Sequence, residues 1–443
     1  MCILNIRMNR SIIQLLRLSV IVCITVIFMR TPKVFTSPVA AGLIAFDDEI
    51  HSSIYDFGNT RSVMKERLLN TIRTWVPLCR RYEIGRIVAR LKEQLARMCL
   101  WKWGIARFNL YPGSQYNITY IGRKSRQNFA QAHLCSNQDL DTSPTRGNRS
   151  SRRVIISEMQ FPGAICVPLS LSSVVPLGRP IEEITSSYHS QLRRSLQKDR
   201  KRYRLQQVIS SAEIEYVDRE MLRPYARARH GDSASQLGRD EIKRMAQGYG
   251  RLDLLLQDDE VVGCQLGHPV TRAGKRYWTT SRCGYPEAVF SDPKRMRDAN
   301  SFNIYLALEW AIENGFDYYD IGISLGRPGD GLLEWKRRRG GELDTMGNTG
   351  YFHVRLPKVG AAQFLWESPL FAVEHRKMTL HLGLPEGPSE AEVMGRYREM
   401  GFGGLFKVYL HCARPPTEHV IKMLHSLYSH QKSPPVFKIV PST

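Results

Sequence analysis

A chain of 443 residues is too long for one ordinary hydrophobic core, so the sequence predicts two domains with terminal extensions. Its 42% hydrophobic and 24% charged residues exclude a largely disordered chain and a fibrous repeat. The 63 Lys and Arg residues against 42 Asp and Glu give a net charge of +21, which favours anionic partners such as phosphates, nucleic acid or an acidic membrane surface. Charges spread over solvated faces explain the same excess, so both interpretations stay open.

Nine cysteines are spaced singly along the chain, with no Cys-x-x-Cys pair. This pattern predicts neither a zinc site nor a disulfide framework. An odd number of isolated thiols favours a reducing compartment. We therefore expect a cytoplasmic protein body.

Residues 1–45 are expected to form an N-terminal extension. Within it, residues 18–29 are an apolar run that follows three arginines. The run is shorter than the ~20 residues that a membrane-spanning helix needs. A membrane-proximal anchor, a signal peptide and a chain that starts at Met29 all fit this pattern, and membrane association through this segment, anchored or peripheral, stays open.

Residues 46–180 are expected to form an N-terminal lobe. The pattern from residue 47 to about 94 is helical, and apolar, strand-like runs follow it. These runs cover residues 116–121, 154–156 and 164–171. The polar residues 136–153 between the first two runs predict a loop.

Residues 181–204 have the apolar spacing of a helix, and a second helix is expected around residues 219–229. Three strand-like runs follow, separated by short polar turns, and they predict an antiparallel meander. The runs cover residues 252–257, 261–267 and 277–284.

The clearest helical pattern of the chain comes next. Asn300 is placed to cap its N-terminus and Gly315 to end it, and a strand is predicted at residues 316–321. A strand, a basic loop, a helix and a second strand in this order predict two parallel neighbours joined by a crossover. The N-terminus of the helix would then lie at their common end.

Two further strands are predicted at residues 351–356 and 405–410, and we expect them to complete the same sheet. The helix between them starts at the capping box Ser389-Glu390-Ala391-Glu392 and stops at Gly401. Residues 413–443 are expected to form a C-terminal tail.

Several motifs in the second half of the chain follow one another in a fixed order. Residues 300–322 contain the helix and the strand, and the segments Gly331-Leu332-Leu333-Glu334-Trp335-Lys336-Arg337 and Gly340-Gly341-Glu342-Leu343 come after them. Together with the basic helix at 188–204, they resemble the FemAB/CelD-like branch of the GNAT superfamily of N-acyltransferases. The resemblance implies an α/β (α+β) fold, with a GNAT-like mixed sheet flanked by helices at residues 181–412. It also implies a degenerate second GNAT-like lobe at residues 46–180.

The same resemblance implies a reaction. Members of this family transfer an acyl or aminoacyl group from a CoA-type thioester or an aminoacyl-tRNA to an amine, without a metal. An anionic substrate agrees with the basic charge of the chain, and nucleic acid enters this interpretation only as aminoacyl-tRNA. We expect the acceptor amine on a cell-envelope or polysaccharide precursor. The sequence does not define the donor, the acceptor or the oligomeric state.

Residues 292–298 stand where GNAT proteins usually carry a pyrophosphate loop, and they depart from its Gln/Arg-x-x-Gly-x-Gly/Ala pattern. Backbone N–H groups at a helix N-terminus bind anions, and basic side chains add charge-assisted hydrogen bonds. A solvated loop is the alternative interpretation. The residues expected to bind the donor are Lys294, Arg295, Arg297, Asn300 and Ser301.

Four residues are candidates for the chemistry. Asp320 is the candidate general base that deprotonates the amine. Its alternative role is to accept hydrogen bonds from loop N–H groups around Gly322 and Ser324. Lys336 is expected to bind a phosphate or the developing oxyanion. Ser324 and Tyr319 are candidates for polar contacts to the acyl carbonyl or the leaving thiol.

The basic residues at 193–204 could bind RNA or a nucleotide-linked substrate, but a solvated helix face is the preferred interpretation. His230 is expected to be a buried or capping histidine rather than a contact to the acceptor. A non-catalytic protein that binds RNA or a membrane surface on a GNAT scaffold is the alternative function.

Overall fold

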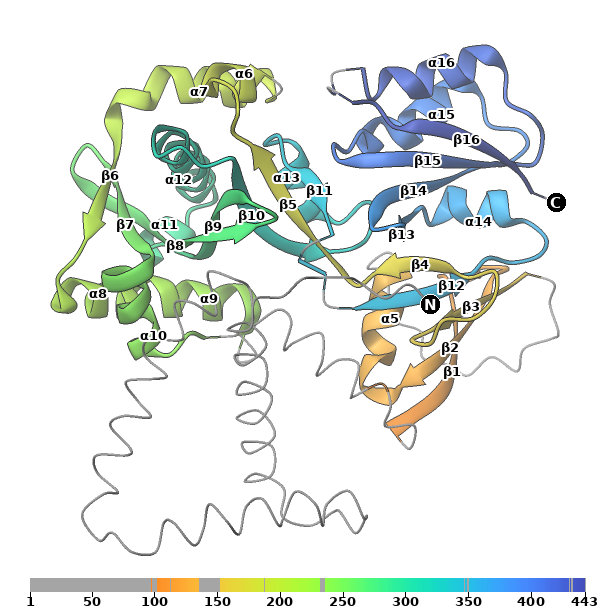
Figure 1. Cartoon of the computed structure of the whole chain (residues 1–443), viewed down its shortest axis with the longest axis horizontal. Coiled ribbons are helices and arrows are strands. Elements are labelled where there is room, and N and C mark those ends of the chain that lie inside the picture. Colours follow the sequence, from red (N-terminus) through yellow and green to blue (C-terminus); the bar gives the residue numbers. More distant parts are fainter. Residues whose placement is uncertain are drawn as a thin grey trace, which may run out of the picture. The chain divides into compact units, whose positions relative to one another are not determined.

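The computed structural model describes Arg97 and residues 102–134 and 152–442, apart from residues 112, 187, 232–235, 346, 349, 430 and 432. The described residues belong to one compact unit, Trp75–Thr443, and form three β-sheets with helices packed on them (Figure 1). The predictions for residues 1–45, for the helical pattern from 47 to 94 and for most of the polar loop at 136–153 lie outside the described residues. No described helix is long and apolar enough to cross a membrane.

The first sheet has the strand order β1-β2-β3-β12-β4. Its strands are β1 (Trp103–Asn109), β2 (Asn117–Arg123), β3 (Arg153–Ser157), β4 (Ile165–Pro168) and β12 (Tyr351–Arg355). β2 and β3 are parallel and are joined through α5 (Gln127–Leu134). The expectation that the strand near residue 351 completes the sheet of the second half is wrong, because β12 pairs with β3 and β4 and its Phe352 and Val354 pack in the core of this first sheet.

The second sheet has the order β11-β5-β10-β9-β8-β7-β6. Its strands are β5 (Ser170–Pro176), β6 (Tyr203–Val208), β7 (Arg251–Gln257), β8 (Glu260–Arg272), β9 (Lys275–Gly284), β10 (Tyr318–Leu325) and β11 (Glu342–Asp344). The predicted meander is confirmed as β7-β8-β9, with two-residue turns of positive φ at Asp258-Asp259 and Ala273-Gly274. Only Leu169 separates β4 from β5, so the chain passes from the first sheet to the second within one apolar region.

β9 and β10 are parallel neighbours joined through α12 (Pro293–Glu313), as the crossover pattern predicts. α12 packs on one face of the second sheet, where its Phe302 and Ala307 lie in the same core as Trp278 of β9. Gly315 follows the helix with a φ of 68°, which agrees with the predicted stop.

The start of α12 differs from the prediction. Its N-cap is Asp292, whose carboxylate accepts hydrogen bonds from the N–H groups of Lys294 and Arg295, and Pro293 is the first helical residue. Asn300 therefore lies inside the helix, and the expected basic loop is the first turn of α12. In the sequence, the pair Asp292-Pro293 is the pattern that indicates this start of the helix.

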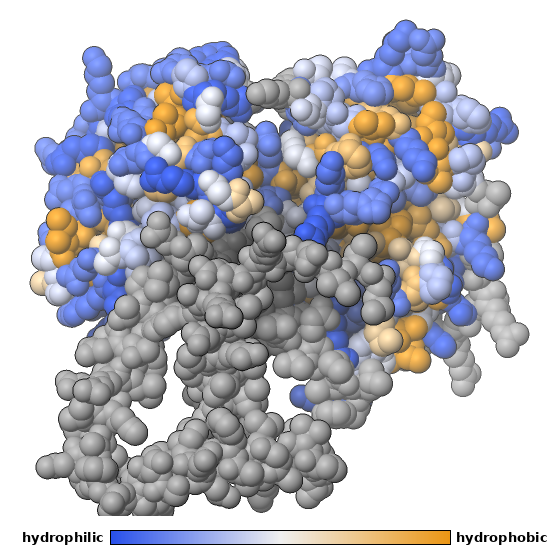
Figure 2. Space-filling view, in the orientation of Figure 1, coloured by the Kyte–Doolittle hydropathy of each residue, from blue (hydrophilic) through white to orange (hydrophobic). Residues whose placement is uncertain are grey.

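Short helices surround the second sheet. The segment predicted as one helix at residues 181–204 contains two, α6 (Ile181–Ser186) and α7 (Ser190–Asp199), and β6 follows them. The surface over α6 and α7 is mainly hydrophilic, which agrees with a solvated face (Figure 2). The other helices are α8 (Ser211–Val217), α9 (Arg223–His230), α10 (Arg239–Arg244), α11 (Glu287–Phe290) and α13 (Gly331–Arg337).

The third sheet has the order β13-β14-β15-β16. Its elements are α14 (Ala361–Glu367), β13 (Leu370–Glu374), β14 (Lys377–Leu384), α15 (Glu390–Tyr397), β15 (Leu405–Cys412), α16 (Glu418–Ser426) and β16 (Val436–Pro441). The predicted capping box of Ser389 and Glu392 starts α15. The expectation that the strand near residue 405 completes the second sheet is wrong, because β15 pairs with β14 and β16 and packs with α15 and α16 in a second core.

The predicted α/β class, with mixed sheets flanked by helices, is confirmed. The domain boundaries stay predictions. The third sheet has strands on both sides of the boundary expected between residues 412 and 413, and β5 of the second sheet precedes the boundary expected at residue 181.

Candidate active site

The parallel strands β9 and β10 pair over a short stretch and then separate. The paired residues are Tyr318–Asp320 of β10 and Tyr277–Thr279 of β9. Beyond them, β9 continues beside β8 and β10 continues beside β5. A β-bulge before Ile323, with a φ of 90° at Gly322, changes the course of β10 at this point. The backbone edges of β9 and β10 are therefore not paired with each other beyond the bulge.

Asp320 lies where the strands separate, and it is fully buried. Its Oδ2 accepts a hydrogen bond from Nη2 of Arg272 at 2.7 Å, and its Oδ1 accepts one from the backbone N–H of Gly322 at 2.8 Å. Arg272 ends β8 and is also buried, with its guanidinium carbon 4.4 Å from the ring centroid of Tyr277. Both carboxylate oxygens have partners, which supports the hydrogen-bonding role for Asp320. Its role as a general base stays a prediction.

Lys336 approaches the same bulge from α13, a helix whose N-terminus is capped by Asp330. The ammonium group of Lys336 donates a hydrogen bond to the carbonyl of Gly322 at 2.8 Å, and only 2% of the residue is exposed. Burial lowers the pKa of Lys336 to about 8, although the carboxylates of Asp320 and Asp330 act in the opposite direction. Such a lysine can exchange a proton near neutral pH as well as carry a charge.

Ser324 and Tyr319 are buried in β10 as well. In the described part of the chain no hydrogen bond reaches Oγ of Ser324, so this hydroxyl is available to a ligand or a water. The hydroxyl of Tyr319 lies 2.7 Å from Oγ1 of Thr280, and burial raises the pKa of its phenol. Tyr319 faces the core shared with α12, away from the carboxylate of Asp320.

The basic residues predicted to bind the donor, Lys294, Arg295 and Arg297, lie in the first turns of α12, and their contact to a donor stays a prediction. The first N–H groups of α12 are bonded to Asp292, whose carboxylate places a negative charge where an anion was expected. Arg295 forms an ion pair with Glu260 at 2.7 Å, while Lys294 and Arg297 are exposed.

Asn300 and Ser301 lie further along α12 and contact protein groups. Oδ1 of Asn300 accepts a hydrogen bond from the hydroxyl of Tyr285 at 3.0 Å. Ser301 accepts one from Nη2 of Arg339 at 3.2 Å, and the Arg339 guanidinium lies 3.9 Å from the ring centroid of Trp335. Burial lowers the pKa of Arg339 to about 10. These contacts link α12 to its neighbours, and a contact of either residue to a donor stays a prediction.

Arg272 is the site residue that the sequence analysis missed. It is the first residue of the turn predicted at residues 272–275, between the second and third strand-like runs, where an arginine is expected to be solvated. Its partner Asp320 is 48 residues away along the chain, and no local pattern connects the two. His230 ends α9, and the prediction for its side chain lies outside the described residues.

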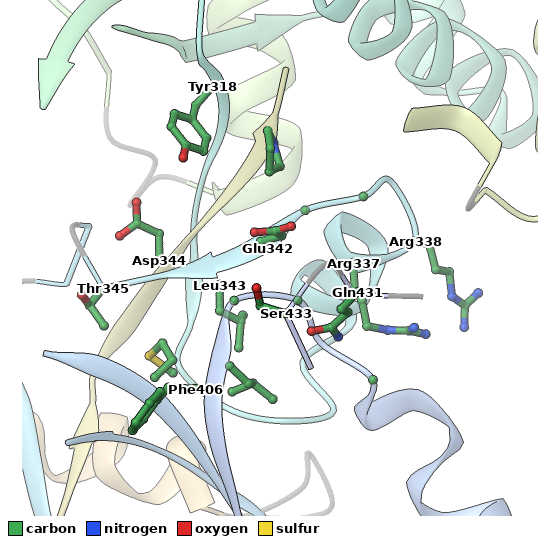
Figure 3. Close-up of a pocket in the computed structure, with 18 of the residues that line it drawn as sticks. Tyr318, Arg337, Arg338, Glu342, Leu343, Asp344, Thr345, Phe406, Gln431 and Ser433 are labelled. Atoms are coloured by element: carbon green, nitrogen blue, oxygen red, sulfur yellow. The ribbon is translucent and has the colours of Figure 1, made fainter. Parts of the chain in front are cut away.

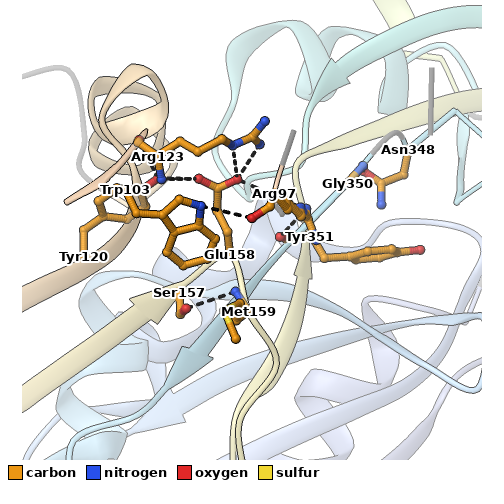
Figure 4. Close-up of polar contacts among 10 residues, drawn as sticks. All are labelled: Arg97, Trp103, Tyr120, Arg123, Ser157, Glu158, Met159, Asn348, Gly350 and Tyr351. Carbon is orange, nitrogen blue, oxygen red and sulfur yellow. Dashed lines mark hydrogen bonds and ion pairs between the residues drawn. The ribbon is translucent and has the colours of Figure 1, made fainter. Parts of the chain in front are cut away.

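The parallel pair in the first sheet does not separate. β2 and β3 pair along five residues, and Glu158 directly follows β3. Its carboxylate accepts hydrogen bonds from the backbone N–H of Arg123 at 2.8 Å, from Nε of the same residue at 2.7 Å and from the hydroxyl of Tyr120 at 2.8 Å (Figure 4). The buried ion pair of Glu158 and Arg123 thus joins the ends of the two strands.

A cavity of about 1740 Å³ opens between β11, α6, α13 and the third sheet (Figure 3). Tyr318, Glu342 and Asp344 line it from the second sheet. Glu342 pairs with Val174, which pairs with Asp320, so these side chains share one face of the sheet. None of the described residues predicted as catalytic or donor-binding lines the cavity. It therefore lies beside the candidate site, at the β11 edge of the second sheet.

No protein-family model matches the sequence, and no curated relative matches it. Solved structures that resemble part of the chain include L-PGS from Bacillus licheniformis, at 13% identity over 58% of this chain and 80% of that chain, with a TM-score of 0.32. FemX is 13% identical over 58% of this chain and 89% of that chain, with a TM-score of 0.33. A GCN5-related N-acetyltransferase from Anabaena variabilis is 10% identical over 76% of this chain and 85% of that chain, with a TM-score of 0.25. Likenesses this distant do not assign the chain to a family.

Proposed function

We propose that the chain is an N-acyltransferase. It transfers an acyl or aminoacyl group from a CoA-type thioester or an aminoacyl-tRNA to an amine on a cell-envelope or polysaccharide precursor. The observation that carries the proposal is the separation of β9 and β10 at Asp320, beside a bulge with buried charges. The motif resemblance of residues 300–343 supplies the reaction type.

The separated strands offer a way to bind the donor. Beyond Asp320 the two strands do not pair with each other, so an extended ligand can lie between them and form strand-like hydrogen bonds with their backbone groups. The arm of a CoA thioester and the single-stranded end of a tRNA are both extended. This mode of binding needs no glycine-rich loop, which agrees with the carboxylate cap on α12.

The reaction needs a deprotonated amine and a stabilised charge on the carbonyl oxygen. The amine nitrogen attacks the carbonyl carbon and loses a proton, the bond from that carbon to the sulfur or oxygen of the donor breaks, and the leaving group takes up a proton. Lys336 lies at the bulge, where its ammonium group can stabilise the oxyanion or supply that proton. Asp320 positions the backbone of Gly322.

The test is amide formation by the full-length chain with acetyl-CoA, longer acyl-CoA thioesters and aminoacyl-tRNA as donors. Turnover of the two kinds of thioester is measured by release of the free thiol. Turnover of aminoacyl-tRNA is measured by loss of the labelled amino acid from the tRNA. We expect turnover with one donor class and a rate lower by about 100-fold in Lys336→Met. Lys438→Met, at an exposed position of β16, is the matched control and should keep the wild-type rate. A folded chain that binds neither donor class would contradict the proposal.

A protein that binds RNA or a membrane surface without catalysis is the second candidate. The Asp292 cap favours it, because it places a carboxylate where a donor phosphate was expected. The basic run at residues 193–204 argues against it, since three of its arginines form ion pairs. These pairs are Arg200 with Glu309, Arg202 with Asp258 and Arg204 with Asp259. Steeply salt-dependent RNA binding without turnover would favour this candidate over the transferase.

A further inference from the structure

The cavity beside β11 has fixed walls. The backbone N–H of Leu343 donates a hydrogen bond to the carbonyl of Gly403 at 2.9 Å, which links β11 to the loop before β15. At Gly404 the φ is 80°, and a Cβ there would lie 2.5 Å from the carbonyl oxygen of Leu343, so this close approach requires glycine. Backbone contacts therefore join the walls that the second and third sheets contribute.

Glu342, the first residue of β11, lines this cavity (Figure 3). It is partly buried, and no hydrogen bond or ion pair within 4 Å reaches its carboxylate from the described residues. Burial raises the pKa of Glu342, and the charge of Arg179 opposes this effect. The other carboxylates that line the cavity have cationic neighbours, namely Glu183 with Arg179, Glu399 with Arg337 and Asp344 with Arg272. Glu342 is thus the lining carboxylate that is available to a ligand.

Two cations line the same cavity from the third sheet. Arg376 and Lys377 lie at the turn between β13 and β14, and both are exposed. Nζ of Lys377 lies 4.3 Å from the ring centroid of Phe406, which also lines the cavity. Neither cation forms an ion pair with the described residues. The cavity therefore presents an available carboxylate on β11 and two available cations on the third sheet.

We propose that this cavity is the acceptor site and that its ligand is a primary amine that also carries an anionic group. Glu342 binds the ammonium group and takes up one of its protons, while Arg376 and Lys377 bind the anionic group. The neutral nitrogen then attacks the carbonyl carbon of the donor, and Glu342 returns the proton to solvent. The catalytic part rests on the proposed function, whereas the binding part does not.

The position of Glu342 agrees with this role. It lies in one cross-strand row with Val174 and Asp320, so the usual strand spacing places the Cα atoms of Glu342 and Asp320 about 10 Å apart. An amine bound at Glu342 therefore lies in the strand row that leads to the separated strands. The side chains of Glu342 and Asp320 extend from the same face of the second sheet.

The binding part is tested by calorimetric titration of the full-length chain with three probes. O-Phosphoethanolamine carries both groups, ethanolamine carries only the amine and ethyl phosphate carries only the anion. We expect the first probe to bind more tightly than the other two, with a Kd that rises about tenfold in Glu342→Gln and in Arg376→Gln. Glu386→Gln, exposed and outside the cavity, should keep the wild-type Kd. Thermal unfolding of each variant checks that it is folded.

Two results would overturn the binding part. One is no binding of O-phosphoethanolamine up to about 10 mM, and the other is an equal Kd in the wild type and folded Glu342→Gln. The catalytic part is tested with whichever donor proves active. The wild-type rate should rise with pH as Glu342 loses its proton, and Glu342→Gln should lose this dependence while donor binding is unchanged.

The two proposals fail in different ways. Amine binding without turnover of any donor would refute the transferase and leave the binding site. Turnover with an unchanged pH profile in Glu342→Gln would refute the role of Glu342 and leave the transferase.

Discussion

Asp320 and Lys336 contact the same residue, Gly322, through its two backbone polar groups. The carboxylate accepts a hydrogen bond from the N–H at 2.8 Å, and the ammonium group donates one to the carbonyl at 2.8 Å. The φ of Gly322 is 90°, a conformation that strains any other residue, so the bulge depends on glycine. Two buried charges therefore fix the backbone at the point where β9 and β10 separate.

Replacing Asp320 with asparagine is expected to destabilise the fold. The change removes the carboxylate closest to the buried guanidinium of Arg272, and breaking a buried pair in this way costs about 3–5 kcal/mol. Urea titration measures the free energy of unfolding. Asp259→Asn is the control, because Asp259 pairs with Arg204 at the surface and its loss should leave the free energy close to that of the wild type. A loss below about 1 kcal/mol in Asp320→Asn would show that the buried pair does not stabilise the bulge.

Lys336 should make the stability of the fold depend on pH. Its pKa of about 8 in the folded chain lies below the ~10.4 of an unfolded lysine, so the unfolded state binds more protons between these values. The free energy of unfolding should therefore rise with pH across this window, by up to about 3 kcal/mol relative to Lys336→Met. Urea titrations of both proteins from about pH 7 to 10 measure the difference. Parallel curves would mean that burial does not lower this pKa.

The cap of α12 can be tested directly. Serine keeps a cap hydrogen bond but removes the charge of Asp292. We expect Asp292→Ser to bind inorganic pyrophosphate more tightly than the wild type, by the roughly 0.3–1 kcal/mol typical of a charge at a helix terminus. Asp298→Ser, further along the same helix, is the matched loss of charge and should have a smaller effect. An unchanged affinity in Asp292→Ser would place the phosphate of the donor away from this helix.

The elements with local signals were predictable from the sequence. The meander, the crossover through α12 and the capping box of α15 depend on patterns within single elements and between elements that follow one another in the chain. The partners of β12 and β15 were not predictable, because an alternating apolar run indicates a strand but does not indicate which sheet receives it. The same limit applies to β5, which pairs with β10 across more than a hundred residues of chain.

The candidate site was predictable where a motif marked it. Asp320 and Lys336 belong to the motifs of residues 300–343, and the structure brings both to one bulge. Arg272 carried no signal, since its role depends on burial next to Asp320. Glu342 is part of the Gly340-Gly341-Glu342-Leu343 motif, but its exposure to a cavity depends on the third sheet. The sequence did not predict this sheet, because the strand near residue 405 was expected to belong to the second sheet.

The ion pair of Glu158 and Arg123 should stabilise the fold without affecting the binding of the donor. Glu158→Gln leaves a buried guanidinium without its carboxylate, so we expect a loss of about 3–5 kcal/mol in the free energy of unfolding. Per folded molecule, donor binding should be unchanged, because the separated strands belong to the second sheet. Glu182→Gln, at an exposed position of α6, is the control for the charge change. Loss of donor binding in folded Glu158→Gln would place the donor in the first lobe and remove β9 and β10 from the candidate site.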